Sequence, residues 1–242
     1  MELTSVSLRE LGSGLSELLA DEHAVIVTEI PTDSNASLMK LAGGLGEYSE
    51  EGITSTTNLR EDQYIHVVNE RATPSLDPYG NTMISTTNEF FPLHTDEYFS
   101  GRPSTYVFLL CVQAGTSGGE STIAKVEDFA RLLPQRTLST LAEPVYPSQA
   151  GLVHLLVQIQ DQWSIRFNEI EMGRAVLGGF APPVPKKARI AVKELKSVAD
   201  QAATQHLLRP GDCLVLRNDR VLHGRLAFPP GSGRSFKRLR VR

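Results

Sequence analysis

The chain has 242 residues, of which 40% are hydrophobic and 21% charged, and its formal net charge at pH 7 is −4. The apolar fraction is typical of a globular protein, and β-rich barrels of about 250 residues often form one domain. The net negative charge argues against a nucleic-acid partner, and no apolar run approaches the ~18 residues of a membrane span. We therefore expect one cytoplasmic domain over residues 1–242, with no nucleic-acid or membrane partner and an oligomeric state that the sequence leaves open.

The two cysteines, Cys111 and Cys213, both lie in apolar runs. This setting favours buried free thiols over a disulfide framework. Two cysteines are also too few for a cysteine-based zinc site.

The first third of the chain has an α/β pattern. Leucines at helical spacing predict a helix over residues 7–20, and the apolar run at residues 24–30 predicts a buried strand. Ser34 is expected to cap a second helix that ends near Leu45. The polar stretch from residue 53 to residue 92 predicts short strands and loops.

The remainder is predicted to be mostly β. Strands are expected within residues 90–112 and 207–242, a hairpin over 151–167, and helices over 126–134 and 187–203. Strands without a regular β-α-β alternation favour an antiparallel barrel or sandwich that carries helices on one face.

A possible metal site lies in the segment FPLHTDEYF, which contains His94 and Asp96, and in VLHGR, which contains His223. Residues two apart on a strand point to the same side, so His94 and Asp96 can converge on one ion, and His223 can complete the site from another strand. Two imidazoles and one carboxylate on one face of a metal are the ligand set of non-haem Fe(II) oxygenases. A His and an Asp two residues apart are common by themselves, and a single histidine is more often a structural residue.

The C-terminal segment is strongly basic. On a strand that starts near Arg234, alternate residues share one face, so Arg234 and Arg238 point the same way. If that face lines a cavity, each buried guanidinium needs an anionic partner, such as a dicarboxylate cosubstrate or a substrate carboxylate. The alternative is a solvated basic edge strand, and this is our expectation for Arg240 and Arg242.

Two long segments together resemble a known family. The run NEFFPLHTDEYFSGRPSTYVFLLCVQAGTSGGESTIA and the run RPGDCLVLRNDRVLHGRLAF with RSFKRLRVR are similar to the metal and arginine motifs of the Fe(II)/2-oxoglutarate dioxygenases of the TauD and clavaminate-synthase-like group. The nearest branch is the one that hydroxylates free amino acids. The resemblance implies a double-stranded β-helix, a jelly-roll or cupin-like core with flanking helices, and the use of Fe(II), 2-oxoglutarate and O2.

The resemblance also assigns roles to residues. It implies that His94, Asp96 and His223 bind iron, that Arg234 pairs with the distal carboxylate of 2-oxoglutarate, and that Arg238 holds an acid group of the substrate. The hydroxyl that contacts the cosubstrate is implied to come from Ser121 or Thr122. The amino-acid branch commonly has Glu where this chain has Asp96, which leaves the subfamily open.

Two asparagines are candidate substrate contacts. Asn88 precedes His94 by six residues and is placed to bind an amino or carboxylate group. Asn168 matches a position that supplies a carboxylate in the arginine-hydroxylating relatives, and Ile170 stands where a second acid is expected. An amide cannot balance a buried cation as a carboxylate does, so a guanidinium substrate is disfavoured. Both asparagines are also common in loops and turns.

We therefore expect an oxygenase that hydroxylates an unactivated C–H bond of a small carboxylate-bearing substrate, such as a free L-amino acid, with release of succinate and CO2. Asp96 argues against halogenation, since a halogenase of this fold is implied to have a small residue there. Desaturation, ring closure, nucleic-acid demethylation, zinc-dependent hydrolysis and a non-catalytic ligand-binding barrel are the alternatives.

Overall fold

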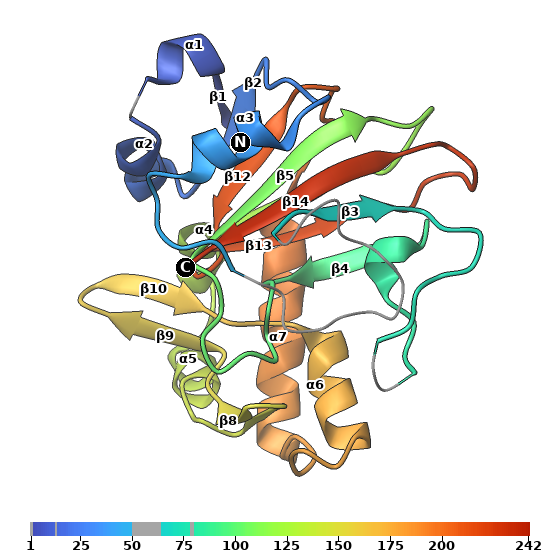
Figure 1. Cartoon of the computed structure of the whole chain (residues 1–242). Coiled ribbons are helices and arrows are strands. Elements are labelled where there is room, and N and C mark those ends of the chain that lie inside the picture. Colours follow the sequence, from blue (N-terminus) through green and yellow to red (C-terminus); the bar gives the residue numbers. More distant parts are fainter. Residues whose placement is uncertain (1, 13, 50–63, 78–79) are drawn as a thin grey trace.

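The computed structural model describes residues 2–12, 14–49, 64–77 and 80–242, and its framework is two β-sheets (Figure 1). The larger sheet has the strand order β1 (Thr4–Ser7), β2 (Ala24–Thr28), β12 (Cys213–Arg217), β5 (Tyr106–Gln113), β14 (Ser235–Val241) and β3 (His66–Asn69). The smaller sheet has the order β11 (Thr204–His206), β6 (Ser121–Lys125), β13 (Val221–Arg225) and β4 (Phe91–His94). Every neighbouring pair is antiparallel except β1 and β2.

A hydrophobic cluster joins the two sheets. Val107 and Phe236 of the larger sheet pack in one buried group with Ile123 and Val221 of the smaller sheet. Successive side chains of a strand point to opposite faces of the sheet, so the residues next to these four in the sequence point to the outer faces. The two sheets therefore face each other across a shared interior.

Helices cover both outer faces. Figure 1 shows α1 (Leu8–Leu11), α2 (Leu15–Glu22) and α3 (Asn35–Ala42) against the larger sheet, where Leu19 and Leu38 are fully buried. On the smaller sheet lie α4 (Val126–Ala130), α5 (Gln135–Leu141), α6 (Glu169–Leu177) and α7 (Lys186–Ala202). Two facing sheets with helices outside form a double-stranded β-helix, and this part of the prediction is confirmed.

The predicted N-terminal helix is wrong in its extent. Residues 4–7 form β1, and the helical residues are divided between α1 and α2, with Gly12 in the left-handed region at φ 53°. The predictions of a strand at 24–30 and a helix after Ser34 are confirmed, and the Ser34 hydroxyl accepts a hydrogen bond from the Ala36 amide at 3.1 Å. The residues from 53 to 63 lie outside the described part, so the loops predicted there are untested.

The predicted hairpin at 151–167 is correct only in its second half. β9 (Leu156–Ile159) pairs with β10 (Gln162–Ile165) around a turn in which Gln160 and Asp161 both have positive φ, whereas β8 (Gly151–Val153) pairs with β7 (Tyr146–Ser148). The helix predicted at 187–203 is confirmed as α7, and the one predicted at 126–134 ends earlier, as α4. The sequence did not predict α5, α6 or the short 3₁₀ turn η1 (Ile84–Thr86).

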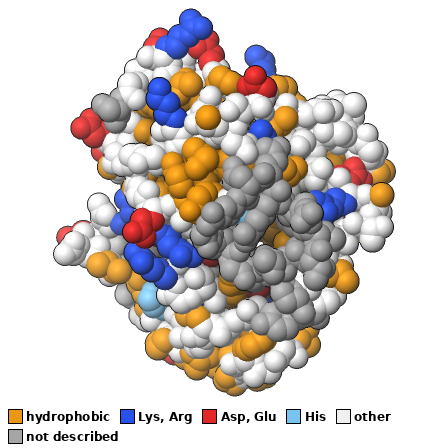
Figure 2. Space-filling model, viewed as in Figure 1, with side chains coloured by type: hydrophobic (Ala, Val, Ile, Leu, Met, Phe, Trp, Pro, Cys, Tyr) orange, Lys and Arg blue, Asp and Glu red, His pale blue; other side chains and the backbone are white. Residues whose placement is uncertain are grey.

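The cysteines, the surface charges and the hydropathy of the helices can also be compared with the sequence. Cys111 and Cys213 are buried free thiols. On the face shown in Figure 2, the lysine and arginine side chains among the described residues form small separate groups rather than one continuous band. Within the described residues, no helix combines the length and the hydropathy needed to cross a membrane.

Candidate active site

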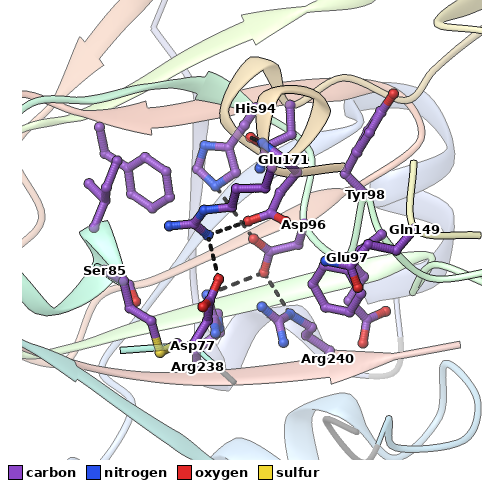
Figure 3. Close-up of a pocket in the computed structure, with 16 residues that line it drawn as sticks. Asp77, Ser85, His94, Asp96, Glu97, Tyr98, Gln149, Glu171, Arg238 and Arg240 are labelled. Carbon is purple, nitrogen blue, oxygen red and sulfur yellow. Dashed lines mark hydrogen bonds and ion pairs between the residues drawn. The ribbon is translucent and has the colours of Figure 1, made fainter. Parts of the chain in front are cut away.

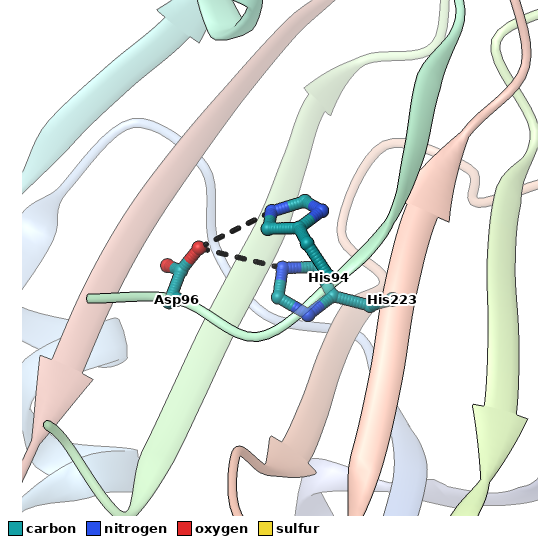
Figure 4. Close-up of side chains that lie close together, drawn as sticks. All are labelled: His94, Asp96 and His223. Atoms are coloured by element: carbon teal, nitrogen blue, oxygen red, sulfur yellow. Dashed lines mark ion pairs between the residues drawn. The ribbon is translucent and has the colours of Figure 1, made fainter. Parts of the chain in front are cut away.

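Three side chains from distant parts of the sequence meet between the sheets. His94 ends β4, Asp96 follows it by two residues, and His223 lies directly opposite His94 on the neighbouring strand β13. Asp96 Oδ1 is 3.5 Å from His94 Nε2 and 3.6 Å from His223 Nε2 (Figure 4). All three residues are at most 5% exposed, and their candidate ligand atoms lie within 4.8 Å of one another.

The two imidazoles are presented in a form suited to a metal. His94 Nδ1 lies 2.9 Å from the Pro92 carbonyl oxygen, and since a carbonyl only accepts, Nδ1 carries the hydrogen and Nε2 keeps its lone pair. Burial and the neighbouring His94 lower the pKa of His223, which favours its neutral form. Phe91 stacks on the His94 ring at 4.1 Å between ring centroids and limits its rotation.

The backbone of Asp96 is fixed by Asn218, in the turn between β12 and β13. Asn218 Oδ1 accepts from the Asp96 amide at 2.8 Å, and its Nδ2 donates to the carbonyl oxygens of Asp96 and Ser104, both at 3.0 Å. Asn218 is 3% exposed. One buried side chain therefore ties the turn before His223 to the loop that carries Asp96.

The second carboxylate oxygen of Asp96 faces arginines of β14. Arg240 Nε donates to Asp96 Oδ2 at 2.6 Å, and an Arg238 nitrogen lies 3.6 Å from the same oxygen. Burial raises the pKa of Asp96, but Arg238 and the two histidines outweigh that effect and hold it well below its usual range. The expectation that Arg240 is a solvated edge residue is wrong, because the residue is 6% exposed and points into the site.

A cavity beside the histidines has Arg234 in its wall. His94, His223, Ser121, Arg234 and Arg238 all line it. The Arg234 guanidinium stacks 3.9 Å from the centroid of the Phe236 ring, and its Nε donates to the Gly119 carbonyl oxygen. Burial and the nearby Arg225 lower the pKa of Arg234 to about 9. A guanidinium this deeply buried is a strong site for a carboxylate.

Ser121 and Thr122 differ in direction. Ser121 lines the cavity with Arg234, while Thr122 is absent from its lining. Neighbouring residues of a strand point to opposite faces, and the Thr122 hydroxyl lies beside Gly224 on the pairing strand. Of the two predicted hydroxyls, the geometry thus favours Ser121 and leaves Thr122 out of the site.

A second, larger cavity adjoins the first and shares Ser85, Phe91, His94 and Arg238 with it. Asp96 and Arg240 close one side of it, and Figure 3 shows the carboxylates of Asp77, Asp96 and Glu171 directed toward its centre. Its wall includes several polar residues that the sequence reading did not assign: Asp77, Gln149, Glu171 and Arg174.

The two predicted asparagines have mainly structural contacts. Asn88 lines neither cavity, and its Nδ2 donates to the Phe228 carbonyl oxygen at 3.1 Å, so its prediction as a substrate contact is not supported by this position. Asn168 does line the larger cavity, but its Oδ1 caps α6 by accepting from the Glu171 amide at 3.1 Å. The resemblance placed a second acid at position 170, which is occupied by Ile170. In the structure the acid of this segment that lines the cavity is the next residue, Glu171.

The three-residue cluster fits Fe(II). Two imidazoles and one carboxylate, buried and on one side of a common point, are the donor set that this ion takes while keeping its remaining positions open. Both histidines also line the cavity that has Arg234 in its wall.

The comparisons with known proteins agree with this geometry. The model of the taurine catabolism dioxygenase TauD, TfdA family matches residues 2–240. The chain belongs to this family. As a TauD/TfdA family protein it is a dioxygenase that uses Fe(II), 2-oxoglutarate and O2. A search of curated protein sequences found no match.

Solved structures share the fold of this TauD/TfdA protein. An asparagine oxygenase in complex with Fe(II), 2S,3S-3-hydroxyasparagine and succinate is 20% identical, with a TM-score of 0.75 over 96% of this chain and 79% of that one. The non-heme iron oxygenase OrfP in complex with Fe and alpha-ketoglutaric acid is 19% identical, with a TM-score of 0.68 over 92% and 76%. OrfP in complex with Fe, succinate and (3S)-hydroxy-L-Arg is 17% identical, with a TM-score of 0.70 over 93% and 78%.

Proposed function

We propose that this dioxygenase hydroxylates a free L-amino acid or a close derivative, with His94, Asp96 and His223 as its iron ligands. The observation that carries the proposal is the pair of adjoining cavities that meet at these residues, one with a buried arginine for the cosubstrate and one with a mixed acidic and basic lining for the substrate. The hydroxyasparagine and hydroxyarginine complexes of the structural relatives support the amino-acid class.

Arg234 and Ser121 bind the cosubstrate in this proposal. The guanidinium receives the distal carboxylate of 2-oxoglutarate through a charge-assisted pair, and the Ser121 hydroxyl adds a hydrogen bond. Phe236 holds the guanidinium in place by stacking. When bound, Fe(II) with 2-oxoglutarate and O2 supplies the oxidising chemistry, and the protein supplies orientation and exclusion of water.

Arg238 and the larger cavity bind the substrate. The Arg238 guanidinium lies where the two cavities join, so a carboxylate held there places the rest of a small molecule in the larger cavity beside the metal ligands. Glu171 and Asp77 offer carboxylates to an ammonium group. A cytoplasmic location, and a small molecule rather than nucleic acid as partner, are parts of this proposal.

Two measurements test the proposal in sequence. Anaerobic addition of Fe(II) and 2-oxoglutarate should produce the weak visible charge-transfer band of the chelated complex. A screen of the twenty amino acids should then find substrate-dependent succinate release, and mass spectrometry should find a product that has gained one oxygen atom. A product that has lost two hydrogens instead would indicate desaturation or ring closure.

The controls separate the alternatives. His223→Ala should abolish both the band and succinate formation, since it removes one of three ligands. Metal binding without the band would favour a zinc enzyme or a non-catalytic barrel. Arg238→Ala should reduce substrate-dependent turnover more than uncoupled decarboxylation, and equal losses in both would contradict its assigned role.

A further inference from the structure

An internal ion cluster lies in the wall of the larger cavity. Arg174 of α6 places one guanidinium nitrogen 2.5 Å from Glu171 and 3.7 Å from Asp77. In Figure 3 the carboxylates of Glu171 and Asp77 point toward each other, and dashed lines join both to the guanidinium between them. The three side chains are 11–15% exposed and line the same cavity as His94 and Asp96.

The cluster is held from two sides. Asp77 accepts hydrogen bonds from the backbone amide and the side chain of Asn81, the former at 2.8 Å. The second guanidinium nitrogen of Arg174 donates to the Thr82 carbonyl oxygen at 2.6 Å. The guanidinium is therefore anchored to Asp77 and Thr82 as well as to its own helix, and it occupies the space between the two acids.

The net charge of the cluster limits how much positive charge of a bound substrate it can neutralise. Asp77 and Glu171 contribute two negative charges and Arg174 one positive charge, so the three groups together carry one net negative charge. An amino acid whose carboxylate pairs with Arg238 brings one α-ammonium group, and one net negative charge balances it. A side-chain cation has no second net charge in this cluster to pair with, and a buried unpaired cation is costly.

We propose that Arg174 is a specificity-determining residue that keeps cationic side chains out of the cavity, so that the substrate is an amino acid without a cationic side chain. Arg174 does this by filling the position between Asp77 and Glu171 that a substrate guanidinium or ammonium would otherwise take. The inference rests on the proposed function and narrows its substrate class.

The test compares uncharged and cationic amino acids as probes. L-asparagine, L-glutamine and L-leucine are set against L-arginine, L-lysine and L-ornithine, with binding followed by the change in the charge-transfer band and turnover by succinate release. In the unmodified enzyme, at least one uncharged probe should be preferred over every cationic probe by about tenfold or more. Arg174→Gln removes the positive charge that lies between the carboxylates of Glu171 and Asp77 and should shift the preference toward cationic probes by about tenfold.

Matched variants keep the result interpretable. Arg174→Lys retains the positive charge and should retain the exclusion of cationic probes, and Arg174→Met is a second variant that removes the charge at similar side-chain length. Circular dichroism and a thermal unfolding curve verify that each variant is folded.

Two results would overturn the inference by itself: a cationic probe preferred by the unmodified enzyme, or an unchanged preference in folded Arg174→Gln and Arg174→Met. In both cases the band and the amino-acid-dependent succinate release persist, so the proposed function stands. Absence of the band in the unmodified enzyme would overturn the proposed function and this inference together.

Discussion

The two oxygens of the Asp96 carboxylate have different surroundings. Oδ1 faces the Nε2 atoms of both histidines, while Oδ2 accepts from Arg240 Nε. An oxygen held at 2.6 Å by a buried guanidinium is not free to turn toward a metal. Asp96 is thus arranged to offer one oxygen, which leaves more positions of a bound metal open to the cosubstrate.

Removal of the Arg240 contact should weaken metal binding. Arg240→Leu removes the hydrogen bond to the second oxygen of Asp96, and we expect a loss of about 10–100-fold in affinity, the usual effect of removing a partner of a metal ligand. The measurement is calorimetric titration of the metal-free protein with Co(II) as a stand-in for Fe(II), without turnover. Arg240→Lys should recover part of the affinity, and equal affinities in the unmodified protein and Arg240→Leu would contradict the positioning role.

Arg234 gives a second prediction at the scale of one residue. Arg234→Leu removes the buried guanidinium that faces the cavity, and a charge-assisted pair inside a site is worth about 2–5 kcal/mol when it is broken. The concentration of 2-oxoglutarate that half-saturates the charge-transfer band should therefore rise by about 30-fold or more. Arg209→Ala, at an exposed position, is the control and should leave the titration unchanged.

At the scale of elements, close packing of strands β4, β6 and β13 sets the position of His223. A Cβ at Gly224 would lie 2.6 Å from the Phe91 carbonyl oxygen and 2.7 Å from the Thr122 hydroxyl. The Phe91 carbonyl belongs to the backbone of a paired strand, so it cannot move without disturbing the sheet. A glycine is needed here for space rather than for an unusual backbone conformation.

Gly224→Ala should therefore destabilise the protein. Overpacking of a buried position costs about 1–3 kcal/mol, and the free energy of unfolding in urea should fall by that amount. Gly44→Ala is the matched control, because a Cβ there meets nothing within 4 Å, and its free energy of unfolding should change by less than about 0.5 kcal/mol. Equal stabilities of the two variants would show that the strands relax around the methyl group.

The elements also show which parts of the site were predictable from the sequence. Arg238 follows from strand alternation, because a period of two fixes which side chains share a face. Asp96 and Arg234 lie just outside β4 and β14, and their roles were predicted from the resemblance to the family motifs. The same alternation places Arg240 on that face, but its burial depends on how far the facing sheet extends, which the sequence does not state. The ion cluster of Asp77, Glu171 and Arg174 was missed for a different reason. It joins the helix α6, which was not predicted, to Asp77 in a polar part of the sequence, and neither segment carries a signal of contact with the other.

At the scale of the whole molecule, the site lies where the two sheets meet. The smaller sheet contributes His94 and His223. The larger sheet contributes Arg238 and Arg240 through β14, and Arg234 directly precedes that strand. The interior apolar cluster that joins the sheets has Phe236 among its members, and this ring also stacks on Arg234. A metal and a dicarboxylate bound here would connect both sheets and would be lost when the sheets separate.

Ligand binding should therefore stabilise the entire fold. A ligand bound only by the native state raises the free energy of unfolding by about 2.7 kcal/mol at a hundred times its dissociation constant. We expect Co(II) with 2-oxoglutarate to raise the midpoint of thermal unfolding, and EDTA to reverse the rise. His223→Ala is the variant that decides the origin of the effect, since it removes one ligand and should abolish the rise. An equal rise in His223→Ala would mean that the metal binds elsewhere on the protein. If Co(II) raises the midpoint and 2-oxoglutarate does not raise it further, a shared site between the sheets is contradicted.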